Sequence, residues 1–304
     1  MNTRDPMDTV TLMARSPEFV EVTDLRSAER LLGELLLDAG TLTPKDVENI
    51  VDEQKRTGRR FGDAARSLGL VNRGELEQAL SRQYDYPYLP ANDRSLSSKV
   101  AAAYRPTSPV GEAMRALRSQ LTMRWFDGSR DRKTMAIMGV ESGVGRSFIA
   151  ANLAVVFAQL GERTLLIDAN LRRPTQHLMF RLANKRGLSG ILSGRGSVEQ
   201  IARFSFLPEL AVLPAGPIPP NPQELLARER FAHLLDDLVS EYDVILIDTP
   251  AAQESADAQT IAHRSKGAVL IARRDHTPIE QLSELDASLQ QAGVSVMGLV
   301  FNDY

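Results

Sequence analysis

Six short apolar runs in the C-terminal two thirds of the chain constrain its fold more than any other feature of the sequence. Each run is apolar throughout instead of alternating with polar residues, which is typical of strands buried on both faces of a parallel sheet. Segments with helical character separate most of the runs. The runs cover residues 135–140, 164–167, 210–213, 244–247, 268–271 and 296–301, and the helical segments include 147–159, 222–242 and 280–292. This alternation predicts an α/β domain with a mostly parallel sheet and helices on both of its faces.

The first third of the chain carries an internal repeat with an offset of 29 residues, which separates Gly33 from Gly62 and Gly40 from Gly69. Each copy reads as a short helix, a glycine cap, a turn and a longer amphipathic helix. Neither copy is able to bury its apolar face alone. We therefore expect the two copies to pack as one small helical domain over residues 23–92.

Proline and serine become frequent after this repeat, and we place a linker at residues 93–109. The α/β domain then covers residues 110–304 and opens with a helix over 110–126. Residues 1–22 contain charged side chains and lack the apolar core of a signal peptide, so we expect them to form a mobile lead-in. No apolar run approaches the roughly 20 residues that a membrane-spanning helix needs.

Composition excludes several classes of function. The net charge of −3, without a long basic tail, gives no electrostatic case for binding nucleic acid. The chain contains no cysteine, which excludes disulfides, thiolate metal sites and cysteine nucleophiles. These features fit a cytoplasmic protein, and we expect any work at a membrane to depend on a partner that recruits it.

A glycine-rich loop, Gly143-Val144-Gly145-Arg146-Ser147, lies between the first apolar run and the helix that follows it. Glycines let successive backbone N–H groups face one phosphate, and the N-terminus of the helix adds partial positive charge. A serine at this place offers its hydroxyl to Mg²⁺. The loop departs from the usual pattern because Arg146 stands where lysine is common, so a glycine turn without a ligand is the alternative.

Two later runs each end in an aspartate, Asp168 and Asp248. In a parallel sheet these strand ends lie on the same edge as the phosphate loop. Two carboxylates beside a loop serine are the groups that hold and orient a hydrated Mg²⁺. The metal ligands that we predict are therefore Ser147, Asp168 and Asp248.

The order of these segments resembles that of the bacterial tyrosine kinases. The phosphate loop is followed by the segment 165–174, which contains Asp168, and then by the strand that ends in Asp248. The segments 187–192 and 215–226 and the pair Asp257-Ala258 agree with the same family. The resemblance covers roughly residues 109–302, and it looks most like the exopolysaccharide (EpsG-type) branch.

This resemblance implies a P-loop NTPase-like domain that binds ATP and Mg²⁺ and transfers the γ-phosphoryl group to tyrosine. Arg146 and the loop amides would hold the phosphates, and Asp168 would orient or deprotonate the tyrosine hydroxyl. The implied catalytic residues are Asp168, Arg146 and Arg172. The implied nucleotide-binding residues are Gly143, Val144, Gly145, Arg146, Ser147, Phe148 and Asn302.

The resemblance also implies partners. Glu112, Arg115 and Arg118 look like the family's E-x-x-R-x-x-R segment, which packs copies into a homo-oligomeric ring. A membrane chain-length determinant would recruit the cytoplasmic chain to the inner membrane, and the substrate would be a protein that contains tyrosine. Tyr304 stands where the family has a C-terminal tyrosine cluster and is a possible phosphoacceptor.

Two departures from the family pattern leave a second function open. Arg146 carries a planar fork that is not equivalent to a lysine ammonium. Asn170 stands where a second aspartate is usual, and an amide neither accepts a proton as a base nor neutralises Mg²⁺. The alternative is a nucleotide-binding regulator with weak catalysis, or an ATPase switch of the ParA and MinD kind.

The helical repeat resembles the MshEN-type N-terminal domain of secretion and pilus assembly ATPases. Some of those domains bind cyclic di-GMP through a repeated arginine–leucine–glycine segment, which implies Arg60, Gly62 and Gly69 as contacts here. The first copy has Leu31 at the arginine position, which weakens the match. A docking domain without a ligand is the alternative.

Overall fold

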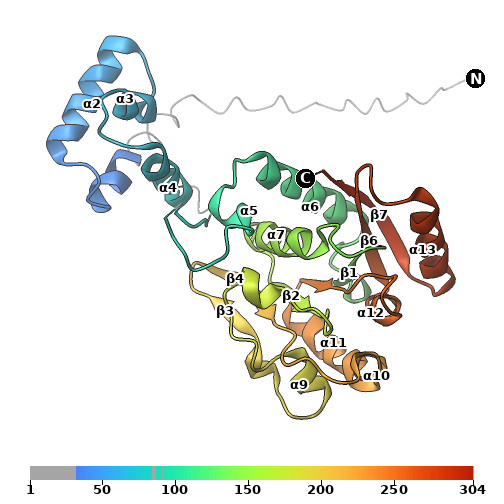
Figure 1. Cartoon of the computed structure of the whole chain (residues 1–304). Coiled ribbons are helices and arrows are strands. Elements are labelled where there is room, and N and C mark those ends of the chain that lie inside the picture. The colour runs from blue at the N-terminus through green and yellow to red at the C-terminus, as the bar shows by residue number, and fades with distance from the viewer. Residues whose placement is uncertain (1–31, 84–86, 91, 304) are drawn as a thin grey trace, which may run out of the picture. The chain divides into compact units, whose positions relative to one another are not determined.

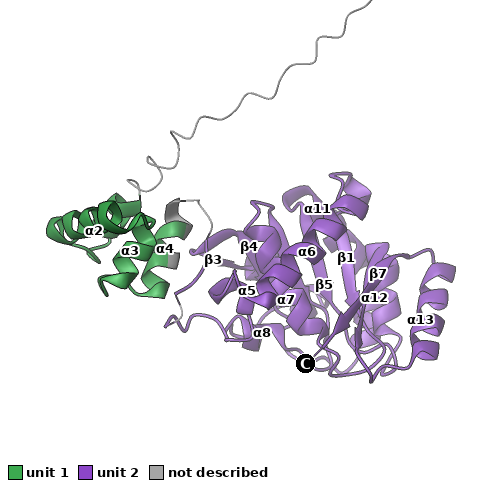
Figure 2. Cartoon of the chain, turned by 90° about the horizontal axis from the view of Figure 1, so that it is seen from above, with its two compact units in different colours: residues 1–83 green, residues 84–304 purple. Residues whose placement is uncertain are grey.

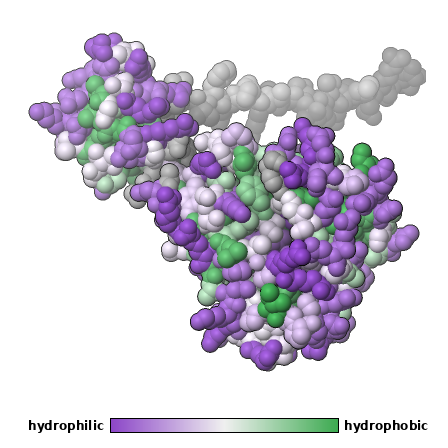
Figure 3. Space-filling view, viewed as in Figure 1, coloured by the Kyte–Doolittle hydropathy of each residue, from purple (hydrophilic) through white to green (hydrophobic). Residues whose placement is uncertain are grey.

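The computed structural model describes residues 32–83, 87–90 and 92–303. The chain divides into two compact units, residues 1–83 and 84–304 (Figure 2). On the face drawn in Figure 3, hydrophilic side chains cover most of the visible surface of each unit, and the apolar patches are separate from one another. Among the described residues, none of the helices combines the length and the apolar character that a membrane span requires.

The first unit repeats its local structure as the offset of 29 residues predicts. A helix over 32–38 precedes α2 (Pro44–Thr57), and α3 (Phe61–Ser67) precedes α4 (Arg73–Gln83) (Figure 1). Capping boxes begin both long helices, formed by Thr43 with Asp46 and by Asn72 with Glu75. The repeat is therefore a structural one.

The glycine caps of the two copies are equivalent as well. Gly40 and Gly69 have φ angles of 68° and 69°, the left-handed conformation that glycine adopts without strain. Apolar residues from both copies fill one core, which includes Leu36, Leu42, Ile50, Phe61, Ala65 and Val71. Each copy therefore buries its apolar face against the other.

The second unit is built on a seven-stranded sheet with the order β3-β4-β2-β5-β1-β6-β7. All neighbouring strands are parallel except β3 and β4. The strands are β1 (Thr134–Met138), β2 (Thr164–Asp168), β3 (Ala202–Phe204), β4 (Leu207–Leu213), β5 (Val244–Asp248), β6 (Gly267–Arg273) and β7 (Ser295–Asn302). This arrangement confirms the predicted α/β class with a mostly parallel sheet.

Helices cover both faces of this sheet (Figure 1). One face packs against α5 (Ala101–Tyr104), α6 (Pro109–Arg124) and α7 (Arg146–Ala158). The other packs against α9 (Leu188–Leu192), α10 (Pro222–Ala227), α11 (Glu229–Glu241), α12 (Asp257–Ser265) and α13 (Ile279–Gln291). The remaining short elements are α8 (Gln176–Met179), η1 (Arg130–Arg132) and η2 (Val198–Gln200).

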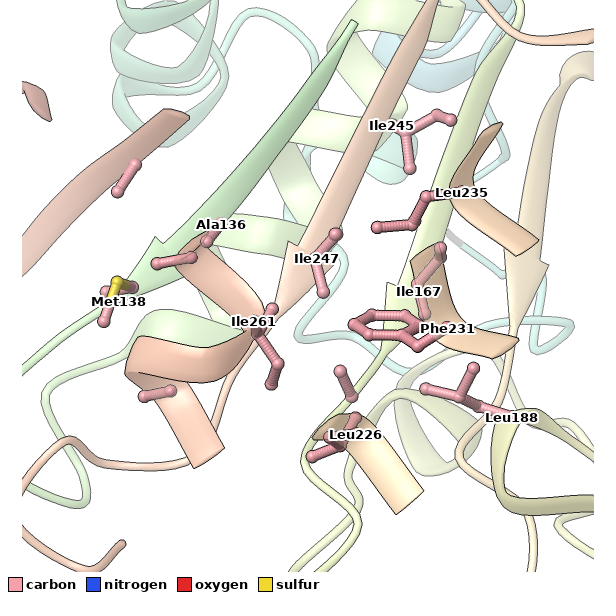
Figure 4. Packing of buried hydrophobic residues seen from close by; sticks show 14 of the residues in the cluster. Ala136, Met138, Ile167, Leu188, Leu226, Phe231, Leu235, Ile245, Ile247 and Ile261 are labelled. Carbon is pink, nitrogen blue, oxygen red and sulfur yellow. The ribbon is translucent and has the colours of Figure 1, made fainter. Parts of the chain in front are cut away.

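Alternate residues of each central strand face opposite layers, as the period of a strand requires. Met135 and Ile137 pack with the α7 layer, whereas Ala136 and Met138 pack with the α11 and α12 layer. Both sets are buried, which explains why the strands read as continuous apolar runs. Figure 4 shows the second layer, with strand residues Ala136, Met138, Ile167, Ile245 and Ile247 facing helix residues Phe231, Leu235 and Ile261.

The prediction that residues 93–109 form a linker is wrong, because this segment is part of the second unit. Leu96 and Val100 are buried in the core of the second unit, and α5 lies within this segment. The Ala102 N–H donates to Asn152 Oδ1 on α7 at 2.8 Å. The three alanines of α5 are small enough to pack closely on α7. Such a short run has no helical periodicity, so the sequence does not indicate a helix here.

The helix predicted over 222–242 is two helices, α10 and α11. Arg228 separates them, with φ −64° and ψ 148°, which is extended backbone. The apolar pattern also does not predict the antiparallel strand β3, because one of its three residues is exposed and the other two are only partly buried.

Candidate active site

The glycine-rich loop folds as a phosphate-binding turn between β1 and α7. Gly143 and Gly145 have φ angles of 82° and 96°, which a side chain rarely tolerates. A Cβ on Gly139 would lie 2.7 Å from the Ile271 carbonyl oxygen on β6, so this position also requires glycine. The loop therefore curls over the N-terminus of α7, where backbone N–H groups and the helix dipole favour an anion.

Asp168 and Asp248 lie side by side at the carboxyl edge of the sheet. They are Cα partners on the parallel strands β2 and β5, and both are fully buried. Asp168 Oδ2 accepts hydrogen bonds from the N–H groups of Thr175 and Gln176, each at 2.9 Å, and its Oδ1 accepts from the Asn170 N–H at 3.2 Å. The strand ends thus bring the two predicted carboxylates together.

Gln176, which sequence reasoning missed, connects the three segments of the site. Its Nε2 donates to Asp248 Oδ2 at 2.7 Å and to the Ser147 carbonyl oxygen at 3.1 Å. Its own N–H binds Asp168. The sequence carried no signal for this role, because a glutamine eight residues beyond a strand-terminal aspartate fits no known chemical pattern.

Burial raises the pKa values of both carboxylates. Loss of hydration is the main cause for Asp168, and the neighbouring Asp248 charge adds to it. Burial also raises the pKa of Asp248, while Ser147, Gln176 and the Arg146 charge act in the opposite direction. Two buried carboxylates in one place therefore favour a bound cation.

The residues at this edge fit a magnesium ion. Asp248 Oδ1 is buried and has no hydrogen-bond partner among the described residues, and the same holds for Gln176 Oε1 and Thr175 Oγ1. Unpartnered buried oxygens match the donors that hold Mg²⁺ and its water shell. Asp248 and Ser147 would hold the ion, and the phosphates of a nucleotide would complete its coordination.

Arg146 is buried beside these carboxylates. Its Nη1 lies 3.4 Å from the Gly139 carbonyl oxygen, and 7% of the residue is exposed. Burial lowers its pKa, and the charges of Asp248 and Glu254 oppose that effect. The guanidinium therefore keeps its charge next to Asp248, in the place where lysine is common.

Comparison with known proteins agrees with this geometry. The family model for the cellulose biosynthesis protein BcsQ matches residues 132–292. The putative tyrosine-protein kinase CapB of Staphylococcus aureus is 34% identical over 212 residues, which cover 70% of this chain and 92% of CapB. The chain belongs to the bacterial tyrosine kinase family.

Two further relatives support this membership. The kinase domain of Escherichia coli tyrosine kinase ETK superposes with a TM-score of 0.65 at 31% identity, over 70% of this chain and 82% of that domain. The putative tyrosine-protein kinase EpsB of Ralstonia solanacearum is 38% identical over 197 residues, which are 65% of this chain and 26% of EpsB. Protein-tyrosine kinase is thus the enzyme class of this chain, and ATP with Mg²⁺ is implied.

Arg172, predicted to be catalytic in this kinase, is held by an ion pair. Its Nε and Nη2 donate to the two carboxylate oxygens of Asp257 at 2.8 and 3.2 Å. Asp257 is fully buried at the start of α12, and its hydrogen bonds raise the pKa of Arg172. The ion pair joins the loop after β2 to α12. It gives a structural role to Asp257, the first residue of the Asp257-Ala258 pair that resembles the kinase family.

Asn170 and Asn302 support loops of the kinase. Asn170 Oδ1 accepts from the Arg173 N–H at 3.0 Å and so closes the turn after Asp168. Asn302, at the end of β7, donates from Nδ2 to the Val144 carbonyl oxygen at 3.0 Å. Phe148 packs in part against the core of the α7 layer. The predicted contacts of Phe148 and Asn302 with a nucleotide stay predictions.

The predicted ring residues lie on α6. Glu112 pairs with Arg115 on the same helix, and 63% of the Glu112 side chain is exposed. Arg118 Nη1 donates to the Val156 carbonyl oxygen on α7 at 2.6 Å, so it also joins α6 to α7. Tyr304, the predicted phosphoacceptor, lies outside the described residues.

Of the three residues predicted to contact cyclic di-GMP, Gly62 and Gly69 have structural roles that explain why they are glycines. Gly69 caps a helix with φ 69°, and a Cβ on Gly62 would lie 2.9 Å from Leu76 Cδ1. Arg60 is exposed and its side chain forms no helix cap. Leu31 lies outside the described residues. Neither the structure nor the relatives support a cyclic di-GMP site, and we do not propose one.

Replacing Gln176 by leucine is expected to weaken both the fold and the kinase. Asp248 then loses a charged hydrogen bond, which costs about 2 kcal/mol of unfolding free energy. The rate of phosphoryl transfer is expected to fall about tenfold or more, as for other changes beside metal ligands. Denaturant unfolding and an ADP-release assay measure the two effects. Gln291→Leu, the same change at the exposed last residue of α13, should alter neither quantity, and equal losses in both variants would contradict this role.

Proposed function

We propose that this kinase transfers the γ-phosphoryl group of ATP to a tyrosine on a neighbouring copy, and thereby regulates the length and export of an exopolysaccharide. The observation that carries the kinase chemistry is the convergence of the phosphate loop, Asp168 and Asp248 at one sheet edge. The match to the cellulose biosynthesis family supports a role connected with polysaccharide.

Each residue of the site has a distinct role in this proposal. Arg146 and the N–H groups of the loop hold the phosphates, and Ser147 and Asp248 hold Mg²⁺, which supplies charge to neutralise the transferring group. Asp168 orients the tyrosine hydroxyl and accepts its proton.

Asn170 and Arg172 act through the loop in this proposal. Asn170 closes a turn and takes no part as an acid or base, which leaves a single carboxylate for the proton. Arg172 is a positioning residue, because both of its bonds go to Asp257. In this proposal the reaction therefore needs no second aspartate at the position of Asn170.

We also propose the setting of the reaction. Exposed Glu112 lies on the α6 surface that would meet a neighbouring copy in a homo-oligomeric ring. A membrane chain-length determinant would recruit the kinase to the cytoplasmic face of the inner membrane. Addition of the cytoplasmic segment of such a partner should raise the rate of tyrosine phosphorylation, and an unchanged rate would count against recruitment.

Asp168→Asn is expected to lower tyrosine phosphorylation about a hundredfold, the usual contribution of a positioned base. Anti-phosphotyrosine detection after addition of ATP and Mg²⁺ measures this loss. Tyr304→Phe, measured in the same way, tests whether Tyr304 is the acceptor: the phosphotyrosine signal is lost if it is and stays unchanged if another tyrosine is. Asp237→Asn, at an exposed position on α11, is the matched control and should retain activity.

The same assay separates the kinase from a nucleotide-switched regulator. A kinase yields ADP together with phosphotyrosine, and its ADP release rises when a tyrosine substrate is added. A switch of the ParA and MinD kind yields ADP without phosphotyrosine. Turnover of that second kind would replace the proposal with the alternative function.

A further inference from the structure

A cavity lined by three arginines lies in the second unit, apart from the residues of the phosphate loop. Its volume is about 530 Å³, and its lining includes Arg94, Arg105 and Arg181 together with Asp93 and Tyr104. None of these residues belongs to the glycine loop or to the two aspartate strands. The kinase chemistry described above leaves the cavity unexplained.

Hydrogen bonds fix the walls of this cavity. The Tyr104 hydroxyl donates to the Leu96 carbonyl oxygen at 2.7 Å and accepts from the Leu96 N–H at 3.0 Å. The Ser97 N–H donates to the Met179 carbonyl oxygen at 2.8 Å, which joins the segment before α5 to the end of α8. The arginines from these two segments are therefore held around one space.

The charge of the cavity is positive. Three arginines and one aspartate line it, and the Asp93 carboxylate accepts hydrogen bonds from the Ser95 N–H and hydroxyl. These bonds lower the pKa of Asp93, so it stays ionised and offsets one of the three positive charges. Within the described part of the chain, the side chains of Arg105 and Arg181 form no ion pair or hydrogen bond.

Arg181 also adopts a backbone conformation that is uncommon for its residue type. Its φ angle is 50°, in the left-handed region that disfavours residues with a side chain. Strain of this kind persists where the surrounding structure enforces it, and it occurs often at ligand sites. The strained residue here is the one that brings the third guanidinium to the cavity.

We propose that this cavity binds a phosphate monoester. The guanidinium fork matches the geometry of phosphate oxygens, and clusters of arginine are the usual means by which proteins recognise phosphorylated groups. The volume admits a phosphate with its attached aromatic or nucleoside group. Two sources share this chemistry: phosphotyrosine, which is the product of the kinase, and a nucleoside monophosphate.

The position of the cavity relates it to the catalytic carboxylates. Ser97 and Arg181 meet the C-terminal end of α8, and Gln176 begins the same helix and binds Asp248. α8 has four residues, so its two ends lie about one helical turn apart. The proposed site is thus distinct from the ATP site but adjacent to it in the fold.

Isothermal titration of the full-length chain with phosphotyrosine and with AMP tests this proposal. The titrations are made with ADP and Mg²⁺ at saturation so that the phosphate loop is filled, and binding of ADP itself is measured first as a separate test of the ATP site. We expect at least one monoester to bind. The double variant Arg105→Gln with Arg181→Gln should weaken that binding by about a hundredfold, because removing each guanidinium costs about tenfold in affinity.

Arg186→Gln is the matched control, because Arg186 is an exposed arginine of the same unit that lines a different cavity. It should bind the ester as the parent does, and circular dichroism should show that all three proteins are folded. Tighter binding of phosphotyrosine assigns the reaction product as occupant, and tighter binding of AMP assigns a nucleotide. Absence of binding by both esters, or equal binding by parent and double variant, would overturn the proposal.

Discussion

Asp248→Asn is expected to reduce tyrosine phosphorylation by at least about a hundredfold. The carboxylate lies beside Ser147 in the proposed magnesium site, and its Oδ1 is left for the ion. An amide cannot neutralise Mg²⁺, and a bound metal ion supplies several kcal/mol of charge stabilisation during phosphoryl transfer. Phosphotyrosine formation at saturating ATP and Mg²⁺ measures the loss. Asp237→Asn, at an exposed position on α11, should leave the rate unchanged.

The same variant should stabilise the chain in the absence of nucleotide and metal. Burial raises the pKa values of Asp168 and Asp248, and the Asp248 charge raises that of Asp168 further, which means that folding disfavours their charged forms. A neutral residue of the same shape removes one of the two charges. The melting temperature should therefore rise while activity is lost. A fall in both quantities would indicate that Asp248 acts through the fold alone.

Gly187→Ala is expected to lower the unfolding free energy by about 3 kcal/mol, near the upper end of what overpacking costs. A Cβ at this position would lie 2.1 Å from the Pro214 carbonyl oxygen and 2.5 Å from the Gly216 N–H nitrogen. These are backbone atoms, so the clash can be relieved only by moving α9 away from the loop after β4. Scanning calorimetry should show a melting temperature lower by roughly 10 °C.

Gly190→Ala provides the contrast within the same helix. The nearest atom to a Cβ at Gly190 is Gln200 Oε1 at 3.7 Å, which is an ordinary contact. Alanine is also the better helix former, by roughly 0.5–1 kcal/mol. This variant should be as stable as the parent or slightly more so, and comparable destabilisation of the two variants would contradict the close approach at Gly187.

The sheet and the pairing of the two aspartates were predictable because both follow from local patterns. Strands buried on both faces read as apolar runs, and parallel strands end at one edge, so Asp168 and Asp248 had to meet beside the loop. The repeat was predictable for a similar reason. Its glycine caps recur at a fixed offset of 29 residues, and a helix end with a positive φ angle requires glycine.

The missed features depend on partners far away in the sequence. Gln176 matters because it meets Asp248, and Arg172 is tethered because Asp257 begins α12. α5 escaped prediction because small buried alanines carry no periodic signal. The break at Arg228 between α10 and α11 reflects one extended residue inside a helical pattern. Contacts of this kind become visible only when the chain is folded.

The central claim is that this chain phosphorylates tyrosine with ATP, and the most direct measurement is a phosphopeptide map of the purified full-length protein after incubation with ATP and Mg²⁺. We predict phosphotyrosine in peptides of the parent and its loss in Asp248→Asn. ADP accumulation in the parent without any phosphotyrosine would contradict the claim and would indicate a nucleotide switch instead.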